Sequence, residues 1–147
     1  MATTTWAELC ALDETALNLL VDATFFARHW EPLRNTYGKI WGYQRCVSTH
    51  GHTSATYETL ALGSMQWATA DWNIVMPLVW RYNLTLRPRM VHYDRRSGAQ
   101  YDGWEVSTSL THTMYGAPVV IVRTEQEARR ELCRLALWCC ASQKNEE

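Results

Sequence analysis

A strict alternation of side chains over residues 103–116 is the feature that most constrains the fold of this chain. The segment reads GWEVSTSLTHTMYG. Successive side chains of a β-strand point to opposite faces of a sheet. One face of such a strand therefore carries Glu105, Ser107, Ser109, Thr111 and Thr113. We predict a long strand here, with a row of short hydroxyl groups along one face.

A second alternating segment precedes it, over residues 78–94, with the sequence LVWRYNLTLRPRMVHYD. Asn83, Thr85 and Arg87 share one of its faces. Pro88 favours an edge position or a bulge, because proline cannot donate to a strand ladder. The intervening residues predict an antiparallel hairpin with a long loop, which places these three polar side chains beside the hydroxyl row.

The rest of the chain predicts two further strands and three helices. Residues 37–48 are rich in aromatic and β-branched side chains, and VVIV at 119–122 is a short apolar run, so both predict strands. Helices are predicted after two capping boxes, Thr5–Glu8 and Thr124–Glu127, and over residues 50–64. The predicted fold is α+β, a mostly antiparallel four-stranded sheet with the helices on one face.

The length of the chain predicts one small domain, and its net charge requires that any anion-binding site use a local cluster of cations. The 147 residues predict a single domain, 1–147, with a disordered tail at 142–147. The net charge is only −1, so cations must be segregated to bind an anion. Five arginines lie between residues 81 and 96 against one acid, and Lys39 and Arg45 share a face of the first strand.

The chain carries no recognisable targeting, membrane, metal or catalytic motif. No apolar run is long enough to span a bilayer, and the start is not a signal peptide. The five cysteines have no framework spacing, which indicates a reducing intracellular compartment. Cys46, His50 and His52 suggest a zinc site, but the other cysteines lack the paired spacing of zinc ligands, so a plain loop with histidines is the preferred interpretation. We predict no metal, no cofactor and no catalytic residue, although a small thiol or zinc enzyme stays a third alternative.

A sheet face of hydroxyls, amides and a few arginines suits double-stranded RNA. The minor groove of A-form RNA is wide and shallow, and proteins contact its phosphates and 2′-hydroxyls rather than its bases. A solvated face is the plainer interpretation, because threonine is common in strands. Trp6, at the start of the first helix, either stacks on the end of a duplex or covers the last helix.

Several collinear segments resemble the small dsRNA-binding silencing suppressors of tombusviruses and aureusviruses. TWAEL followed by ALDET is similar to the family's end-capping helix, and YGKI at 37–40 to the start of its first strand. LALGS at 60–64, WEVSTSLTHTMYG at 104–116 and PVVIVRTEQEARRELCRLA at 118–136 resemble later elements in the same order.

The resemblance implies a homodimer whose joined sheets hold an RNA duplex without reading its sequence. It implies that Trp6 stacks on the duplex end, that Lys39 contacts a phosphate, and that Arg123 and Thr124 contact RNA at the start of the last helix. It also implies contacts from Ser109, Thr111 and Thr113 to the RNA backbone. Leu9 stands where the family has a second stacking tryptophan, so selection by duplex length is expected to be loose.

We therefore predict a non-enzymatic homodimer in the host cytoplasm that binds small interfering RNA and suppresses RNA silencing for a plant virus. A host silencing factor is a further expected partner. The alternative is a Trp-rich viral module that binds a host protein without binding RNA. The predicted RNA-binding residues are Trp6, Lys39, Arg45, Arg87, Ser107, Ser109, Thr111, Thr113, Arg123 and Thr124.

Overall fold

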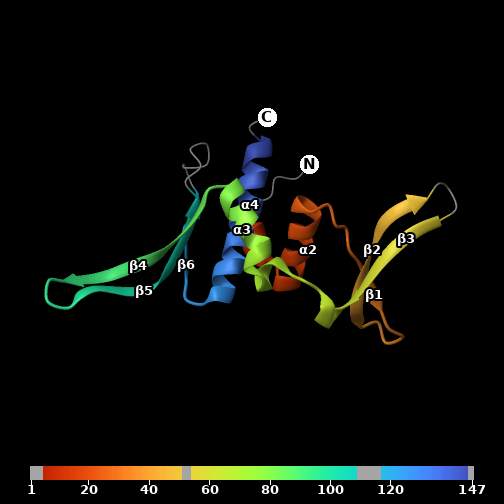
Figure 1. Cartoon of the computed structure of the whole chain (residues 1–147), viewed down its shortest axis with the longest axis horizontal. Coiled ribbons are helices and arrows are strands. Elements are labelled where there is room, and N and C mark those ends of the chain that lie inside the picture. The colour runs from red at the N-terminus through yellow and green to blue at the C-terminus, as the bar shows by residue number, and fades with distance from the viewer. Residues whose placement is uncertain (1–4, 51–53, 109–116, 146–147) are drawn as a thin grey trace. The chain divides into compact units, whose positions relative to one another are not determined.

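The computed structural model describes residues 5–50, 54–108 and 117–145 (Figure 1). These residues confirm the α+β class: they form four α-helices and six strands. The strands make two three-stranded antiparallel sheets, in place of the single four-stranded sheet that we predicted. The sheets belong to two compact units, one of Met1–Leu17 with Trp67–Glu147 and the other of Asn18–Gln66.

Two helices, not one, occupy the N-terminal segment. Helix α1 spans Trp6–Ala11, and the Thr5 hydroxyl accepts a hydrogen bond from the Glu8 N–H at 3.1 Å, as the capping box predicts. Helix α2 spans Glu14–Phe25. Asp13 accepts from the Ala16 N–H at 2.7 Å, so it starts a second helix where we predicted a continuous one.

The last helix, α4, spans Glu125–Asn145 and forms the core of the first unit. Thr124 accepts from the Glu127 N–H at 3.1 Å, which confirms the hydroxyl bond of the second capping box. The predicted apolar face of the helix is buried, at Ala128, Leu132, Leu135, Ala136 and Cys139. The helix ends within the segment 142–147 for which we predicted disorder. Among the described helices, none has the length and apolarity needed to cross a bilayer.

A buried arginine of α4 joins this helix to α1. The Arg134 guanidinium bonds to the Glu131 carboxylate one turn earlier on the same helix. Its Nε also donates to the Leu9 carbonyl at 3.2 Å, and a terminal nitrogen donates to the Leu12 carbonyl at 3.3 Å. The last carbonyls of a helix lack their usual partners within that helix, and the Leu9 carbonyl also accepts from the Leu12 N–H at 3.3 Å. Arg134 therefore both neutralises Glu131 and caps the C-terminal end of α1.

Helix α3 spans Trp72–Arg81, so the first residues of the predicted strand 78–94 are helical. Asp71 caps it by accepting from the Asn73 N–H at 2.9 Å. Val75, Leu78 and Tyr82 are buried and lie three or four residues apart, as on one side of a helix. This helical pattern outweighs the alternation from which we predicted a strand starting at residue 78. The helix stops where Asn83 takes a positive φ of 51°, a conformation typical of helix ends.

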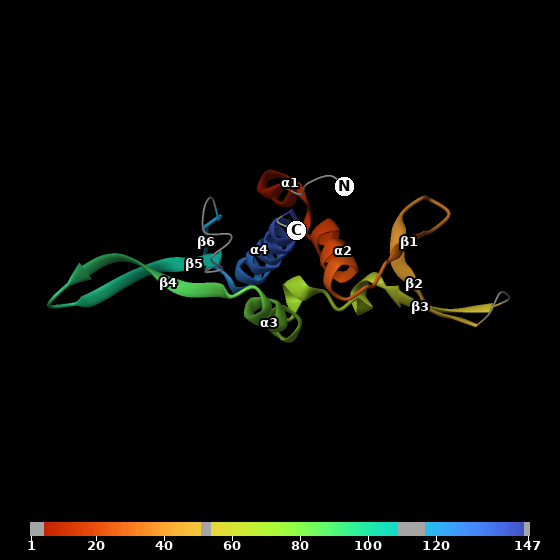
Figure 2. The same cartoon turned by 90° about the horizontal axis from the view of Figure 1, so that it is seen from above.

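The sheet of this unit has the order β4-β5-β6, with β4 at Leu84–Asp94, β5 at Gly98–Thr108 and β6 at Val120–Val122. The predicted β4–β5 hairpin is confirmed, but three residues connect it instead of a long loop. Asp94 accepts from the Arg96 N–H at 3.0 Å, and Gly98 has a φ of +81°, so both tighten the turn. Strand β6 pairs only with residues 104–106, and the rest of the hairpin is a two-stranded ribbon (Figure 2).

The second unit contains the sheet β1-β2-β3, formed by Glu31–Arg34, Ile40–His50 and Ser54–Ala61. The prediction of a helix over 50–64 is wrong, because β3 pairs with β2 and only Leu62–Ser64 forms a 3-10 turn. Tyr57 and Thr59 favour a strand, and Glu58 lies opposite Arg45. Strand β1, which we did not predict, places Pro32 on a sheet edge that tolerates it.

Replacing Arg134 tests whether its bonds to Glu131 and to the carbonyls of α1 stabilise the fold. We expect Arg134→Met to lower the free energy of unfolding by up to about 3–5 kcal/mol, because it removes the nearer of the two cations beside the buried Glu131 carboxylate and leaves only Arg130, whose Nε lies 3.6 Å away. Arg123→Met is the control. It removes an exposed ion pair, for which we expect a loss of about 0–1 kcal/mol. Urea denaturation measures both, and equal losses in the two variants would contradict the assignment.

Candidate nucleic-acid interface

Where α4 covers the β4-β5-β6 sheet, one face of the sheet is buried and the opposite face carries mostly polar side chains. Thr85 pairs with Ser107 across the strands, and Arg87 pairs with Glu105. Paired residues of antiparallel strands share a face, so these four side chains lie together. The opposite face carries Leu84, Val106 and Val122, which are buried, and α4 contacts all three strands. The predicted separation into a helix-covered face and a polar face therefore holds for this sheet.

Only part of the predicted hydroxyl row lies within the described residues. Ser107 is half-buried on the polar face, beside Thr85. Ser109, Thr111 and Thr113 fall in 109–116, outside the described residues. Thr108 is on the buried face and its hydroxyl donates to the Tyr82 carbonyl at 3.0 Å, so it serves the fold. The described polar face thus offers two hydroxyl groups opposite each other.

Each predicted arginine of this unit faces a carboxylate. The Arg87 Nε lies 3.1 Å from Glu105 Oε2, and an Arg123 terminal nitrogen lies 3.0 Å from Asp102 Oδ2. Both arginine side chains are about two-thirds exposed. Such exposed pairs contribute about 0–1 kcal/mol, so a phosphate competes with the carboxylate at little cost. Thr124, next to Arg123, already uses its hydroxyl oxygen to cap α4.

The two positions of the predicted end-capping helix differ in burial. Trp6 is the first residue of α1 and is half-buried. Leu9 is fully buried, and its carbonyl accepts from Arg134. A side chain at position 9 therefore belongs to the core and does not reach a ligand. Trp6 is the one position of the two whose ring retains an exposed part.

Lys39 and Arg45 belong to the other unit and the other sheet. Lys39 is exposed in the β1–β2 turn, where its backbone N–H donates to Asn35 Oδ1 at 3.0 Å. The Arg45 guanidinium lies 2.7 Å from Glu58 Oε2, and its central carbon lies 5.4 Å from the centre of the Trp30 ring. These contacts make Arg45 part of the packing of its own sheet.

A polar cavity of about 220 Å³ lies beside Arg45, and the sequence did not reveal it. Asp22, near the end of α2, accepts from the Trp30 indole N–H at 2.7 Å at the cavity wall. Burial raises the pKa of the Asp22 carboxyl, and the Trp30 hydrogen bond and the charges of Arg28 and Arg45 oppose that rise. Asp22 and Trp30 are eight residues apart with no motif between them, so no sequence signal indicates this pair.

The described residues hold no group of three or more histidine, cysteine or acidic side chains placed to bind a metal ion. Cys46 is exposed on β2, while His52 lies outside the described residues and the His50 side chain is not described. Burial raises the pKa of the Cys139 thiol to about 11, so this thiol stays protonated at neutral pH. A protonated thiol is a poor nucleophile.

The buried carboxyl of Asp22 predicts a specific dependence of stability on pH. Its pKa is higher in the folded state than the ordinary 3.8, so the folded state keeps the proton more tightly. Its contribution to stability is therefore complete below about pH 3.8 and is lost as the pH rises through the folded pKa. We expect the stability of Asp22→Asn to increase relative to that of the wild type as the pH rises from about 3.8 through the folded pKa of Asp22. Urea denaturation at several pH values measures the difference, and a difference that stays constant would contradict the assignment.

The chain was also compared with known proteins. No family model, curated protein or solved structure matches it.

Proposed function

We propose that the chain binds double-stranded RNA as a homodimer, without reading base sequence. By holding small interfering RNA in the host cytoplasm, it suppresses RNA silencing for a plant virus, and it acts as a binding protein rather than an enzyme. The observation that carries the proposal is the polar face of the β4-β5-β6 sheet. There Thr85 and Ser107 lie opposite each other, next to Arg87. The family resemblance of the sequence supports the same conclusion.

The chemistry of this face suits the backbone of a duplex. Thr85 and Ser107 are short, so the sheet can approach the shallow minor groove closely and exchange hydrogen bonds with phosphates and 2′-hydroxyls. Arg87 is bound to Glu105 through an exposed, weak ion pair, and a phosphate takes the place of the carboxylate. Binding by phosphate contacts is independent of sequence and weakens as salt is added.

The burial of Leu9 favours loose selection of duplex length. A protein that measures a duplex must contact both of its ends, and stacking on the ends requires exposed rings. Trp6 keeps part of its ring exposed, whereas Leu9 is buried in the core. Long duplexes are therefore expected to bind as well as short ones.

The outer edge of β6 pairs with no other strand among the described residues, and this supports the homodimer. Strand β6 is the last strand of its sheet, and Val119 and Ile121 are exposed there. Open edges with apolar side chains readily pair with another strand. Pairing of two β6 strands about a two-fold axis joins the polar faces of two sheets, with the two Ile121 side chains at the seam.

The double variant Thr85→Val with Ser107→Ala tests the polar face. Loss of two hydrogen bonds of about 0.5–1.5 kcal/mol each predicts a dissociation constant for blunt duplex RNA that is roughly 5- to 150-fold higher. A gel-shift titration at fixed salt measures it, with single-stranded RNA and duplex DNA as competitors.

Thr59→Val is the matched control, because Thr59 is an exposed strand residue of the other sheet. We expect its affinity for duplex RNA to equal that of the wild type. Unchanged affinity of the double variant would mean that the face is merely solvated. A wild-type protein without preference for duplex RNA would refute the proposal as a whole.

The variant Ile121→Lys tests dimerisation through β6. Antiparallel pairing of two β6 strands brings residue 121 of each copy close together, and like charges at that spacing repel. We expect sedimentation velocity to show monomers for this variant and dimers for the wild type. Val47→Lys, at an exposed position of β2, is the control and should remain dimeric. A dimer that survives Ile121→Lys would place the interface elsewhere.

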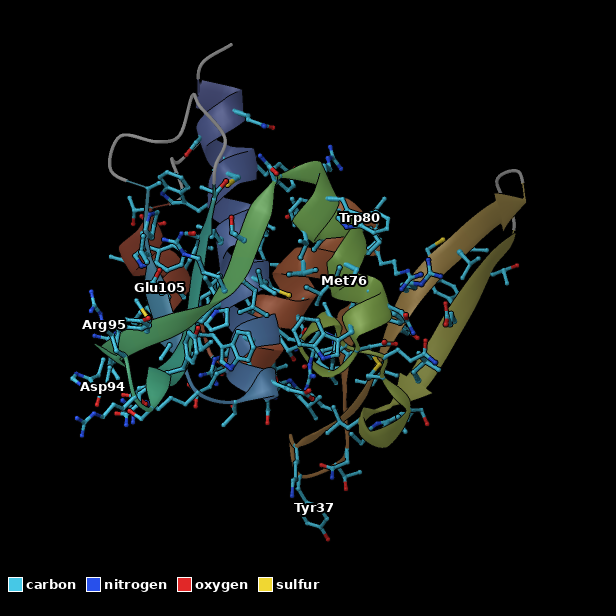
Figure 3. All side chains as sticks on the ribbon, turned by 60° about the vertical axis from the view of Figure 1, so that its left-hand side comes forward. Tyr37, Met76, Trp80, Asp94, Arg95 and Glu105 are labelled. Atoms are coloured by element: carbon cyan, nitrogen blue, oxygen red, sulfur yellow. The ribbon has the colours of Figure 1, made fainter. Side chains whose placement is uncertain are left out.

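One observation favours the alternative of a protein-binding module. Trp80 on α3 is 78% exposed, and Met76 lies one turn before it on the same side of the helix (Figure 3). Exposed tryptophan and methionine are common in protein interfaces. If Trp80→Ala abolishes binding of a host protein while the wild type binds no RNA, this alternative replaces the RNA proposal.

A further inference from the structure

The core-side face of the β4–β5 hairpin continues as an apolar stripe beyond the part that is covered. Strand β6 ends opposite Trp104, and the ribbon extends past it to the turn at residues 95–97 (Figure 1). Exposure rises steadily along this face, from 0% at Val106 to 44% at Trp104, 60% at Tyr101 and 64% at Tyr93. Large exposed apolar surfaces on a protein of this size usually mark an interaction site.

The strand register places these rings on one face. Tyr101 lies opposite Met90, and Met90 follows Leu84 on β4 at even spacing, which keeps it on the core side. Tyr93 lies opposite Ala99, two residues from Tyr101, and so shares the same face. Diagonal neighbours of this kind are about 7–8 Å apart. Tyr93 and Tyr101 are therefore neighbours on one face of the ribbon.

The tip of the ribbon supplies the positive charge. Arg95 and Arg96 occupy the turn and are exposed, and neither forms an ion pair within the described residues. Asp94, beside them, accepts a hydrogen bond from the backbone of the turn. Asp94 and Arg95 lie together at the far end of the hairpin (Figure 3). The tip therefore combines free guanidinium groups with exposed aromatic rings.

We propose that this face of the ribbon binds unpaired RNA, with bases stacked on Tyr93, Tyr101 and Trp104 and phosphates held by Arg95 and Arg96. Aromatic side chains beside cations are the means by which proteins hold single strands without reading sequence. The site lies on the opposite face of the hairpin from Thr85 and Ser107. It goes beyond duplex binding and does not rest on it.

Charge favours a nucleic acid over a second copy of the chain as the occupant. Arg95 and Arg96 place two positive charges at the tip, which complement an anionic partner. The carboxylates Glu105 and Asp102 of the same sheet are already paired with Arg87 and Arg123, so another ribbon offers these cations few free acids. The flat rings beside the cations select a strand with bases over an acidic peptide, because each base presents a π-face for stacking.

The test measures binding of a short fluorescent single-stranded RNA, without self-complementarity, to the full chain by anisotropy. Tyr93→Leu with Tyr101→Leu keeps apolar bulk and removes both rings. Each stack contributes about 1–3 kcal/mol, so we expect the dissociation constant to rise at least about 20-fold. Tyr93→Phe with Tyr101→Phe keeps the rings and should bind like the wild type. Tyr37→Leu, at an exposed tyrosine in the β1–β2 turn, is the matched control and should also be unchanged.

Other outcomes overturn the proposal. Equal affinity of the double leucine variant and the wild type would show that the rings do not bind bases. A change of the oligomeric state in that variant, seen by sedimentation, would make the stripe an interface between copies. Affinity for blunt duplex RNA is measured on the same variants and should not change. A wild type that binds single strands through the ribbon but binds no duplex would refute the duplex proposal alone.

Discussion

The buried guanidinium of Arg134 is the interaction on which the first unit depends. It joins three groups that are costly to leave alone in a core: the Glu131 carboxylate and the carbonyls of Leu9 and Leu12. Through it, α1 is held on α4, and α4 in turn covers the β4-β5-β6 sheet. The position of Trp6 and the division of that sheet into a buried and a polar face therefore follow from the packing of a single helix.

Local signals in the sequence predicted local structure well. Both capping threonines, the apolar face of α4 and the alternation around Val106 depend on neighbours within a few residues, and the structure confirms them. The errors arose where one local signal competed with another. Asp13 starts a second helix where one continuous helix was predicted. The helical spacing of Val75 and Leu78 outweighed the alternation at the start of the predicted strand 78–94. The strand at Ser54–Ala61 is stabilised by its partner β2, which a single segment does not reveal.

The candidate site was predicted less well than the fold, because its charges act in pairs across strands. Arg45 and Arg87 are predicted RNA-binding residues, yet Glu58 and Glu105 lie directly opposite them. Finding those partners requires the register, and bulges between Pro88 and Met90 and between Met90 and His92 shift the register of the β4–β5 hairpin. The exposed face of Tyr93 and Tyr101 was missed for the same reason: alternation followed along one strand does not carry through a bulge into the next.

Because β6 pairs only with residues 104–106 of β5 among the described residues, the two parts of the β4–β5 hairpin differ in local stability. Around Val106, three paired strands and a helix cover the backbone, so we expect amide protons there to exchange slowly with solvent. Beyond Trp104, the two strands rely on each other alone, and a two-stranded ribbon is only marginally stable in water. The hairpin is therefore more rigid at its root, around Val106, and more flexible at its tip, at the turn 95–97. A ligand at the root meets a preformed surface, whereas a ligand at the tip must also order the ribbon that holds it.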